Sequence, residues 1–319
     1  MTAAHNPDRH TERSITISRL TRANHQRVIG GSGELSYKRA LIRLLDRPGG
    51  RFLLGNIATR FFRRIAGHDL KIAFLHGLWT RRSGSYYFPD SPTFDYSYSD
   101  FESWKHQAEQ YAFQTKDFWL QHYSPKQGDI LVDVGAGHGE DTLTFSQAVG
   151  ATGRVIAIEA HPLSFAILKN FCWLNQLSNV TPIQLALMDK PGTVHMVESD
   201  SSWMENAVEP GQRSAGIPVR ACTLGDVCEQ QGLKDIAFLK MNIEGAERAA
   251  LIGMEPVMQH ILQICVACHD FRADLGHGEQ FRTRAFVERF LVERGFTLAS
   301  RSHDPRDFVR DHVFGLRRV

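Results

Sequence analysis

Three glycines follow a short apolar run in the middle of the chain, and together they have the pattern of a nucleotide-binding turn. The run is Ile130–Val134, it contains one acid, Asp133, and the glycines are Gly135, Gly137 and Gly139. Such a run is typical of a buried parallel strand, and the residues after the glycines are typical of a helix. Glycine lacks a Cβ, so the backbone can turn sharply and a ligand can lie against it. The pattern predicts a nucleotide-binding corner at the carboxyl edge of an open α/β sheet.

The spacing of the glycines indicates which nucleotide this corner binds. A dinucleotide fingerprint reads G-x-G-x-x-G and presents a helix N-terminus to a pyrophosphate. Here Glu140 stands where the last glycine would be, and its carboxylate would repel a pyrophosphate. S-adenosylmethionine has no phosphate, and the carboxylates of Asp133 and Glu140 are compatible with its sulfonium and ammonium groups. A plain tight turn is the alternative that the loop alone leaves open.

Polar residues also end the later strands of the pattern. Glu159 ends a second predicted strand, 154–159, and stands 26 residues after Asp133. Its carboxylate there would accept both ribose hydroxyls of an adenosine, the alternative being a solvated acid at a strand end. A fourth strand ends in Lys240–Glu247, with the sequence KMNIEGAE. A lysine inside a buried strand needs a partner, and helix capping explains only some of the polar groups that follow it.

A histidine follows the fifth predicted strand, 261–268, and faces the same edge of the sheet. The ordinary pKa of a histidine suits a general base near neutral pH, although a lone histidine is usually structural. We therefore expect His269 to be the first candidate for a catalytic base, with Glu244 and Asp270 as the second candidates.

Strands and helices alternate after residue 126, which predicts a doubly wound, mostly parallel α/β sheet. A third strand is expected at 180–187 and the fourth at 235–243, with a short β insertion at 193–197 and an edge strand at 217–224. The last two strands, 297–300 and 311–316, are expected to form an antiparallel hairpin. Helices are expected at 140–149, 162–174, 244–252 and 281–293.

The front of the chain is organised differently. We expect a polar tail at 1–14, a mainly helical and aromatic extension at 15–125, and the catalytic domain at 126–319. Within the extension, the segment 79–98 is dense in aromatic residues. It is expected either to line or cover a pocket as a loop, or to form a small separate core.

One helix of this extension, at 51–66, is basic and amphipathic. Its apolar side carries Leu54, Ile57, Ala58, Phe61 and Ile65, and its other side carries Arg60, Arg63 and Arg64. Packing on the catalytic domain is the favoured interpretation, and peripheral contact with an anionic membrane is the alternative. An apolar front segment of this kind also allows a homodimer.

Five segments occur in a characteristic order: Asp133–Gly139, Ile158–Pro162, Leu168–Asn170, Asn175–Val180 and Leu239–Glu247. In this order they resemble the FkbM-type S-adenosylmethionine-dependent methyltransferases, over about residues 125–270. The resemblance implies a class I methyltransferase (Rossmann-like) fold with S-adenosylmethionine as cofactor. It further implies O-methylation, by in-line displacement, of a hydroxyl on a secondary metabolite, sugar, glycolipid or polyketide. The cofactor contacts expected with it are Asp133, Gly135, Ala136, Gly137, Glu140, Thr142, Glu159, Ala160 and Asn242.

The chain departs from the family pattern at two places. Asn242 stands where the family more often has Asp, and His161-Pro162 stands where it has Asn-Pro. An amide still hydrogen-bonds a cofactor but supplies no charge to a metal ion, so we expect no required Mg²⁺.

Composition limits the remaining possibilities. The net charge of +2 gives no reason to expect a nucleic-acid partner, and no apolar stretch approaches the ~20 residues that span a bilayer. The polar start of the chain is not a secretory signal, and the odd count of five cysteines predicts a reducing cytoplasm. The pair Cys265 and Cys268 is expected to be buried and structural, because strand residues three apart point to opposite faces. A nicotinamide-dependent oxidoreductase, a nucleic-acid methyltransferase and a non-enzymatic scaffold stay as alternatives.

Overall fold

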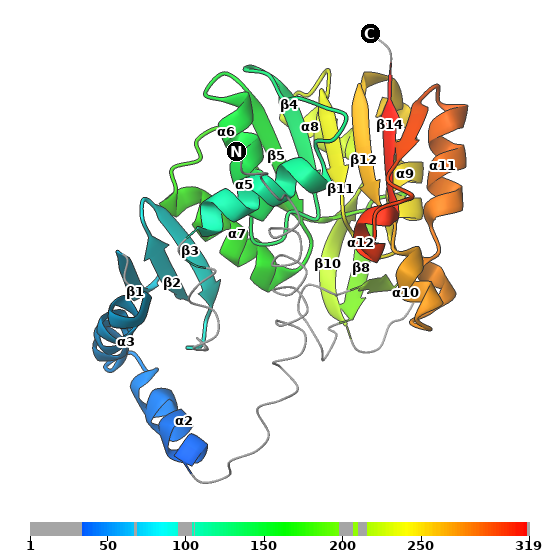
Figure 1. The fold of residues 1–319 in the computed structure, drawn as a ribbon. Coiled ribbons are helices and arrows are strands. Elements are labelled where there is room, and N and C mark those ends of the chain that lie inside the picture. Colours follow the sequence, from blue (N-terminus) through cyan, green and yellow to red (C-terminus); the bar gives the residue numbers. More distant parts are fainter. Residues whose placement is uncertain are drawn as a thin grey trace, which may run out of the picture.

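A large sheet with helices on both faces lies beside a smaller sheet with two helices of its own (Figure 1). This computed structural model describes residues 34–66, 69–94, 104, 106–197, 207–209 and 216–317. The predicted tail at 1–14 and Tyr96 and Tyr98 of the aromatic segment lie outside the described residues.

The large sheet confirms the predicted doubly wound, mostly parallel fold. Its seven strands have the order β13-β14-β12-β11-β4-β5-β6. The parallel strands are β4 (Ile130–Val134), β5 (Arg154–Glu159), β6 (Val180–Gln184), β11 (Phe238–Met241) and β12 (Gln263–Ala267). At one edge β14 (His312–Leu316) runs antiparallel to both β12 and β13 (Thr297–Ser300), as the predicted hairpin requires.

Helices cover both faces of this sheet because the strands are apolar on both sides. One face packs against α5 (Gln107–Phe118), α6 (Glu140–Val149) and α7 (Pro162–Leu174), with Phe145 and Phe238 in its core. The other face packs against α8 (Leu224–Gln231), α9 (Glu247–Met254) and α11 (Arg284–Glu293). Short helical segments complete this part of the chain: η3 (Glu255–His260), α10 (Asp270–Asp274), η4 (Glu279–Phe281) and α12 (Asp307–Arg310).

A four-stranded sheet begins one residue after β6 of the large sheet. It has the order β7-β10-β8-β9 and consists of β7 (Ala186–Leu187), β8 (Gly192–Val197), β9 (Ala207–Glu209) and β10 (Ile217–Cys222). The predicted strand 217–224 is two residues too long. It ends at Cys222 because Thr223 and Asp226 form a reciprocal capping box that starts α8.

The front of the chain contains helices α2 (Glu34–Leu45) and α3 (Arg51–Ala66), as predicted, but also three strands that the sequence did not predict. These are β1 (Leu70–Leu75), β2 (Leu78–Ser83) and β3 (Tyr86–Ser91), which form an antiparallel meander. The first turn is only two residues long, and both of them, His76 and Gly77, have positive φ angles. Histidine is uncommon in that conformation, so the turn gave little signal in the sequence.

The aromatic segment forms strands and a small separate core rather than a loop over a pocket. Trp79 is fully buried in β2, with the rings of Phe74 and Phe94 at 5.4 and 4.9 Å from its own. The core continues into α3 through Leu54, Ala58 and Phe62. Helix α3 therefore packs on β1 of this small sheet, and the expectation that it packs on the catalytic domain is wrong.

Side chains of the catalytic domain hold this small sheet in place. Asn175, which follows α7, accepts a hydrogen bond from the backbone N–H of Tyr87 (2.9 Å) and donates one to its carbonyl (2.8 Å). Phe88 packs beside these bonds against Leu143 and Phe171. Because β3 is the edge strand, these bonds also satisfy backbone groups that its neighbour β2 leaves open.

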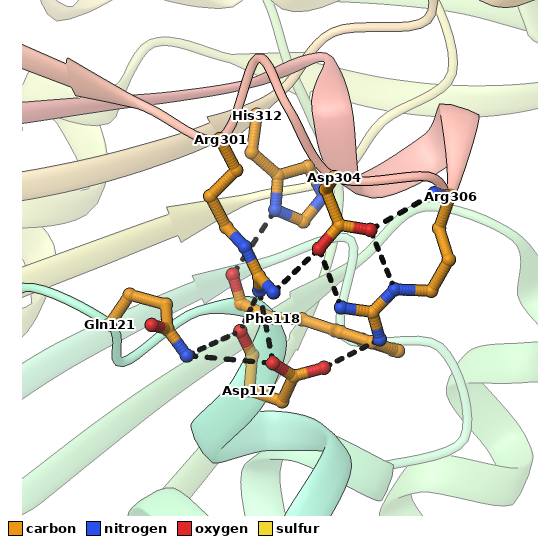
Figure 2. A network of polar contacts seen from close by, with 7 residues as sticks. All are labelled: Asp117, Phe118, Gln121, Arg301, Asp304, Arg306 and His312. Atoms are coloured by element: carbon orange, nitrogen blue, oxygen red, sulfur yellow. Dashed lines mark hydrogen bonds and ion pairs between the residues drawn. The ribbon is translucent and has the colours of Figure 1, made fainter. Parts of the chain in front are cut away.

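Helix α5 is fixed to the far edge of the large sheet by a network of charges, which Figure 2 shows. Asp117 of α5 binds Arg301 at 3.1 Å and Arg306 at 2.6 Å, and Asp304 binds both arginines from the other side. His312 of β14 is hydrogen-bonded to the carbonyl of Phe118 at 3.1 Å. A segment that precedes β4 in sequence is thus tied to the last strands of the chain.

Candidate functional site

A pocket of about 950 Å³, its opening to solvent included, lies at the carboxyl ends of β4 and β11. These two strands are neighbours in the sheet, but the chain leaves β4 toward β5 on one side and β11 toward β12 on the other. Such a switch in direction is where open α/β sheets bind their ligands, because the two loops diverge there.

The glycine loop after β4 forms one wall of the pocket. Gly135 has φ = 73°, and a Cβ at this position would lie 1.9 Å from the carbonyl oxygen of Asn242. Gly139 has φ = 101° and is the N-cap of α6, where a Cβ would lie 2.8 Å from the ring of Phe171. The loop can therefore contact the β11–α9 connection and α7 only because these positions lack side chains.

A buried lysine fixes the floor of this loop. The ammonium of Lys240 lies 2.9 Å from the Asp133 carboxylate and donates to the carbonyl of Gly135 at 2.7 Å. Burial alone would lower the pKa of Lys240, but the charges of Asp133 and Asp141 outweigh it and raise the pKa above its ordinary value. Thr142 donates to the other oxygen of Asp133 at 2.6 Å. Asp133 and Thr142 thus lie beneath the pocket and hold the loop, while Lys240 also reaches its wall.

Glu159, at the end of β5, closes the adjacent wall. One carboxylate oxygen accepts from the N–H of Gly137 at 2.9 Å and the other from the N–H of His161 at 2.8 Å. Burial raises the pKa of Glu159, and these two amides lower it in part. Each oxygen keeps a further lone pair for a ligand, so the carboxylate is held in one orientation at the wall of the pocket.

His161 takes the place of the Asn that the resemblance leads one to expect. It is the N-cap of α7, and its Nδ1 accepts from the N–H of Ser164, with Pro162 as the first helical residue. A histidine can therefore supply the capping acceptor that an asparagine would supply.

The wall near α6 is acidic. Glu140 lines the pocket, and burial raises its pKa to about 7. Asp141 lines it as well, and burial also raises the pKa of its carboxyl group. Asp141 accepts a hydrogen bond from Thr115 of α5 at 2.8 Å, and Lys240 lies 3.6 Å away.

The opposite wall is apolar. It consists of Ile158, Leu185, Ala186, Leu187 and Met196. Ala186 and Met188 are the residues one would expect from the end of the third strand to flank an adenine. Met188 is buried behind the wall, whereas Met196 reaches the pocket from β8, and only the pairing of β8 with β10 places it there.

Beyond Asn242, which lines the pocket, Glu244 lies in a cluster of charges. Its φ of 53° is unusual for a residue with a side chain. His269 Nε2 lies 3.2 Å from one oxygen of Glu244, and Arg272 donates to the other at 2.5 Å. Burial alone would raise the pKa of Glu244, but His269 and Arg272 outweigh it and hold the pKa below its ordinary value.

His269 lies between two carboxylates and is almost fully buried. Its Nδ1 lies 2.9 Å from Glu247, a carboxylate with no solvent exposure. Burial alone would lower the pKa of His269, but Glu244 and Glu247 outweigh it and raise the pKa to about 10. This raised pKa favours the imidazolium, and both ring nitrogens lie against carboxylate oxygens. His269 does not line the pocket, so its contacts make it a residue that positions Glu244.

Asp270 caps the start of helix α11. Its carboxylate accepts from the N–H groups of Thr283 and Arg284, both at 3.0 Å, which are the first amides of α11. Those bonds satisfy donors that a helix N-terminus leaves open. Of the three residues expected to act in catalysis, Glu244 is the one that lines the pocket.

The structure therefore brings most of the expected cofactor residues to one pocket. Seven of the nine line it, namely Gly135, Ala136, Gly137, Glu140, Glu159, Ala160 and Asn242, and the other two support it from below. Sequence reasoning did not place His161, Ser164 or Met196 there.

The cysteines take no part in this site. All five are buried and without disulfide bonds, and Cys265 and Cys268 lie in the cores on opposite faces of the sheet, so they cannot share a ligand. Among the described residues, no group of three or more His, Cys, Asp or Glu side chains could hold a metal ion. In the same part of the chain, every helix is too short or too polar to cross a bilayer.

The pocket as a whole suits a nucleoside that carries positive charge. Glu140, Asp141, Glu159 and Glu244 face it, against the single cation of Lys240 among the lining residues. The carboxylate of Glu159 is oriented to accept hydrogen bonds from a diol, and it lies beside an apolar wall that a nucleobase could contact. The acids near α6 and α9 would stabilise a positively charged group.

Comparison with known proteins agrees with this description. The family model for the methyltransferase FkbM domain matches residues 133–298. No curated protein matches the sequence of the chain.

Several solved structures match part of the chain at low identity. The methyltransferase FkbM of Methylobacillus flagellatus KT is 17% identical over 66% of this chain and 51% of its own, with a TM-score of 0.44, so the match spans about half of that protein. Fibrillarin of Aeropyrum pernix, solved with bound S-adenosyl-L-methionine, is 14% identical over 65% of this chain and 72% of its own, with a TM-score of 0.39. A SAM-dependent O-methyltransferase of Thermotoga maritima is 13% identical over 66% of each chain, with a TM-score of 0.36.

Proposed function

Because the chain belongs to the FkbM family of methyltransferases, we propose that it transfers a methyl group from S-adenosylmethionine to a hydroxyl oxygen of a small-molecule acceptor. S-adenosylmethionine is the cofactor of this family. A secondary metabolite, sugar, glycolipid or polyketide is the acceptor class that we propose.

The described residues fit this cofactor. Glu159 has both oxygens oriented by backbone amides at the pocket wall, where a ribose diol needs acceptors. Ala186 and Met196 supply an apolar surface for the adenine, and Glu140 supplies negative charge for the cationic part. Gly135, Ala136 and Gly137 let the ligand lie against the backbone of the loop.

The position of Glu159 is the observation that carries the proposal. A single carboxylate at the end of the second parallel strand, clamped against the glycine loop, selects a ribose with two free hydroxyls. A pyrophosphate would meet Glu140 and Asp141 at the N-terminus of α6, so this end of the pocket opposes a dinucleotide.

When bound, S-adenosylmethionine supplies a methyl group that its sulfonium has already activated for transfer. The remaining task of the protein is to orient the acceptor hydroxyl and to exclude water. We assign the acceptor side of the site to Glu244, whose carboxylate lines the pocket and is held by Arg272 and His269. Glu244 accepts the hydrogen bond of the hydroxyl and fixes its direction, and a carboxylate in that position also receives the proton.

The cofactor assignment is tested by calorimetry with S-adenosylmethionine and S-adenosylhomocysteine. Glu159→Ala is expected to weaken the binding of both by about tenfold or more, because two hydroxyls lose a charged acceptor. Glu229→Ala, on the exposed side of α8, is the matched control and should bind normally. Equal affinity for Glu159→Ala and the native protein would overturn the role of Glu159.

The acceptor chemistry is tested with methyl-labelled cofactor and paired acceptors that differ only in a hydroxyl or an amine. Transfer to the hydroxyl member, with the label in an ether that survives mild alkali, is expected. Glu244→Gln should lower kcat and leave cofactor affinity unchanged, since the amide can orient the hydroxyl but cannot take its proton. Label found only on nitrogen would overturn O-methylation.

A further inference from the structure

Helices α2 and α3 carry a face that packs against nothing in the described part of the chain. Fourteen large hydrophobic side chains are exposed among the described residues, and half of them lie on these two short helices. Phe52 is 84% exposed and Tyr37 81%, and the others are Leu41, Leu44, Leu53, Ile57 and Phe61. In Figure 1 the two helices lie at the end of the molecule away from the seven-stranded sheet.

The exposed residues of α3 form a stripe of their own. Leu54, Ala58 and Phe62 recur every four residues and are buried against the small sheet. Leu53, Ile57 and Phe61 recur with the same spacing one position earlier, and each is at least half exposed. The helix therefore has a second apolar surface that its own fold does not use. Isolated exposed hydrophobics are ordinary, but a contiguous group of them marks an interaction surface.

Positive charge surrounds this surface. The two helices and the turn between them, residues 34–66, contain eight basic and two acidic residues, which gives +6. The rest of the chain contains 29 basic and 33 acidic residues and carries −4. The two helices are thus net positive while the rest of the chain is net negative. The positive segment is also the one that carries the exposed apolar face.

The arginines of α3 divide into paired and unpaired ones. Arg63 is held by the Asp69 carboxylate and the carbonyl of Leu70. Arg60 and Arg64 were expected on the side of the helix opposite Ile57, but at ~100° per residue they fall beside Leu53 and Ile57, at the edge of the apolar side. Both are exposed, and within the described residues neither has an ion pair. Their guanidinium groups can therefore extend beside the apolar stripe toward a negatively charged partner.

Asp46, the acid between the two helices, is already paired. Asp46 pairs with Arg51 and accepts hydrogen bonds from the Trp79 indole and the Phe94 N–H. Among the side chains that the structure describes, no acid forms an ion pair with Arg39, Arg43, Arg47, Arg60 or Arg64.

We propose that the exposed face of α2 and α3 docks on an anionic lipid surface, with Phe52, Ile57 and Phe61 among the acyl chains and the arginines at the headgroups. A helix with one apolar face and a basic rim lies in the plane of such an interface. A second copy of this chain fits less well, because the arginines of two like-charged faces would then meet each other. The inference does not depend on which acceptor the enzyme methylates.

The experiment uses the full chain and sedimenting vesicles of phosphatidylcholine, with and without one fifth phosphatidylglycerol. We expect binding to the anionic vesicles that weakens with salt, and little binding to the neutral ones. Near a charged bilayer each basic residue contributes roughly fivefold to affinity, so Arg60→Gln/Arg64→Gln should weaken binding at least tenfold. Leu53→Gln/Ile57→Gln should weaken it as well, because the buried apolar area is lost.

Matched control variants distinguish binding through this face from nonspecific binding of the protein to vesicles. Arg248→Gln/Arg289→Gln and Leu275→Gln/Val292→Gln change residues of the same kinds that are equally exposed on other helices and loops, and both should bind vesicles normally. Cofactor affinity should be unchanged for all variants, since none touches the pocket, and thermal melts check that each variant stays folded. Failure of the native protein to cosediment, equal binding to neutral vesicles, or equal loss in the controls would overturn the proposal. So would a dimer in light scattering that Leu53→Gln/Ile57→Gln converts to a monomer.

Discussion

Protonation of His269 should make the stability of this protein depend on pH in a specific range. The histidine lies between Glu244 at 3.2 Å and Glu247 at 2.9 Å, and its pKa of about 10 compares with 6.5 in an unfolded chain. Because the folded-state pKa is the higher one, the imidazolium stabilises the fold fully below pH 6.5. This stabilisation is lost as the pH rises through about 10.

The size of the effect follows from the same values. The difference between 6.5 and about 10 corresponds to a stabilisation on the order of 5 kcal/mol, lost at about 1.4 kcal/mol per pH unit between them. Removing the partner of a buried charge costs a similar amount, about 3–5 kcal/mol. His269→Gln, which leaves the Glu247 carboxylate buried without its cation, should therefore be several kcal/mol less stable than the native protein at pH 6.5.

Urea denaturation at intervals between pH 6.5 and 9.5 measures this difference. The gap in unfolding free energy between the native protein and His269→Gln should narrow steadily as the pH rises. The ring proton signals of His269 in NMR give an independent reading, and they should still report an imidazolium at pH 8.5. His277→Gln, at an exposed histidine, is the control and should follow the native curve.

Two parallel stability curves, or an NMR titration of His269 near pH 6.5, would refute this reasoning. Either result would mean that the histidine is neutral and has a nitrogen available. It would then return to consideration as the general base, which was the expectation from its place at the end of the fifth strand.

Two other residues of the pocket give further predictions. Burial raises the pKa of Glu140 to about 7, and a bound cation favours the ionised carboxylate, so S-adenosylmethionine should bind up to about tenfold more weakly per pH unit below 7. Calorimetry from pH 5.5 to 8 measures this, and a slope that persists in Glu140→Gln would refute it. Lys240→Met should cost about 3–5 kcal/mol because Asp133 is buried without its cation. Adding Asp133→Asn should restore much of that stability in urea denaturation, and a double variant as unstable as the single one would contradict the pairing.

The strands around the site were predictable because their sequence signals are local. Ile130–Val134 is a buried apolar run bounded by turn residues, and both ends of β4 fall where that pattern places them. The carboxyl ends of parallel strands share one edge, so the strand-end residues Glu159 and Asn242 could be assigned to one site before any distance was known.

Predictions that depended on contacts between distant residues were less successful. The helix expected from Glu244 starts at Glu247, because Glu244 and Gly245 both have positive φ angles that a helix cannot contain. What holds Glu244 there is its pairing with His269 and Arg272, more than twenty residues away. The same long-range pairing places both ring nitrogens of His269 against carboxylates, which no local pattern in the sequence could indicate.

The three strands of the front sheet were missed for a different reason. Arg81 lies in the middle of β2 and is buried, which the sequence alone would read as a solvated position. Its guanidinium lies 4.1 Å from the ring of Trp104 and donates to Gln107. Strands are recognised in a sequence by alternating apolar and polar residues. A buried arginine that stacks on an aromatic ring interrupts this alternation, because a polar residue stands at a buried position.

The attachment of α5 has a consequence for how the chain can be divided. The segment matched by the family model begins at residue 133, after α5, and the domain boundary that we expected lies at 125/126. Yet Trp119 stacks on His312 and lies over Lys240, and Asp117 neutralises two arginines near β13. In a shortened protein that starts at residue 126, the sheet face that α5 covers would be exposed to solvent, and so would Lys240. We therefore propose that helix α5, which begins at Gln107, is part of the same folding unit as the large sheet.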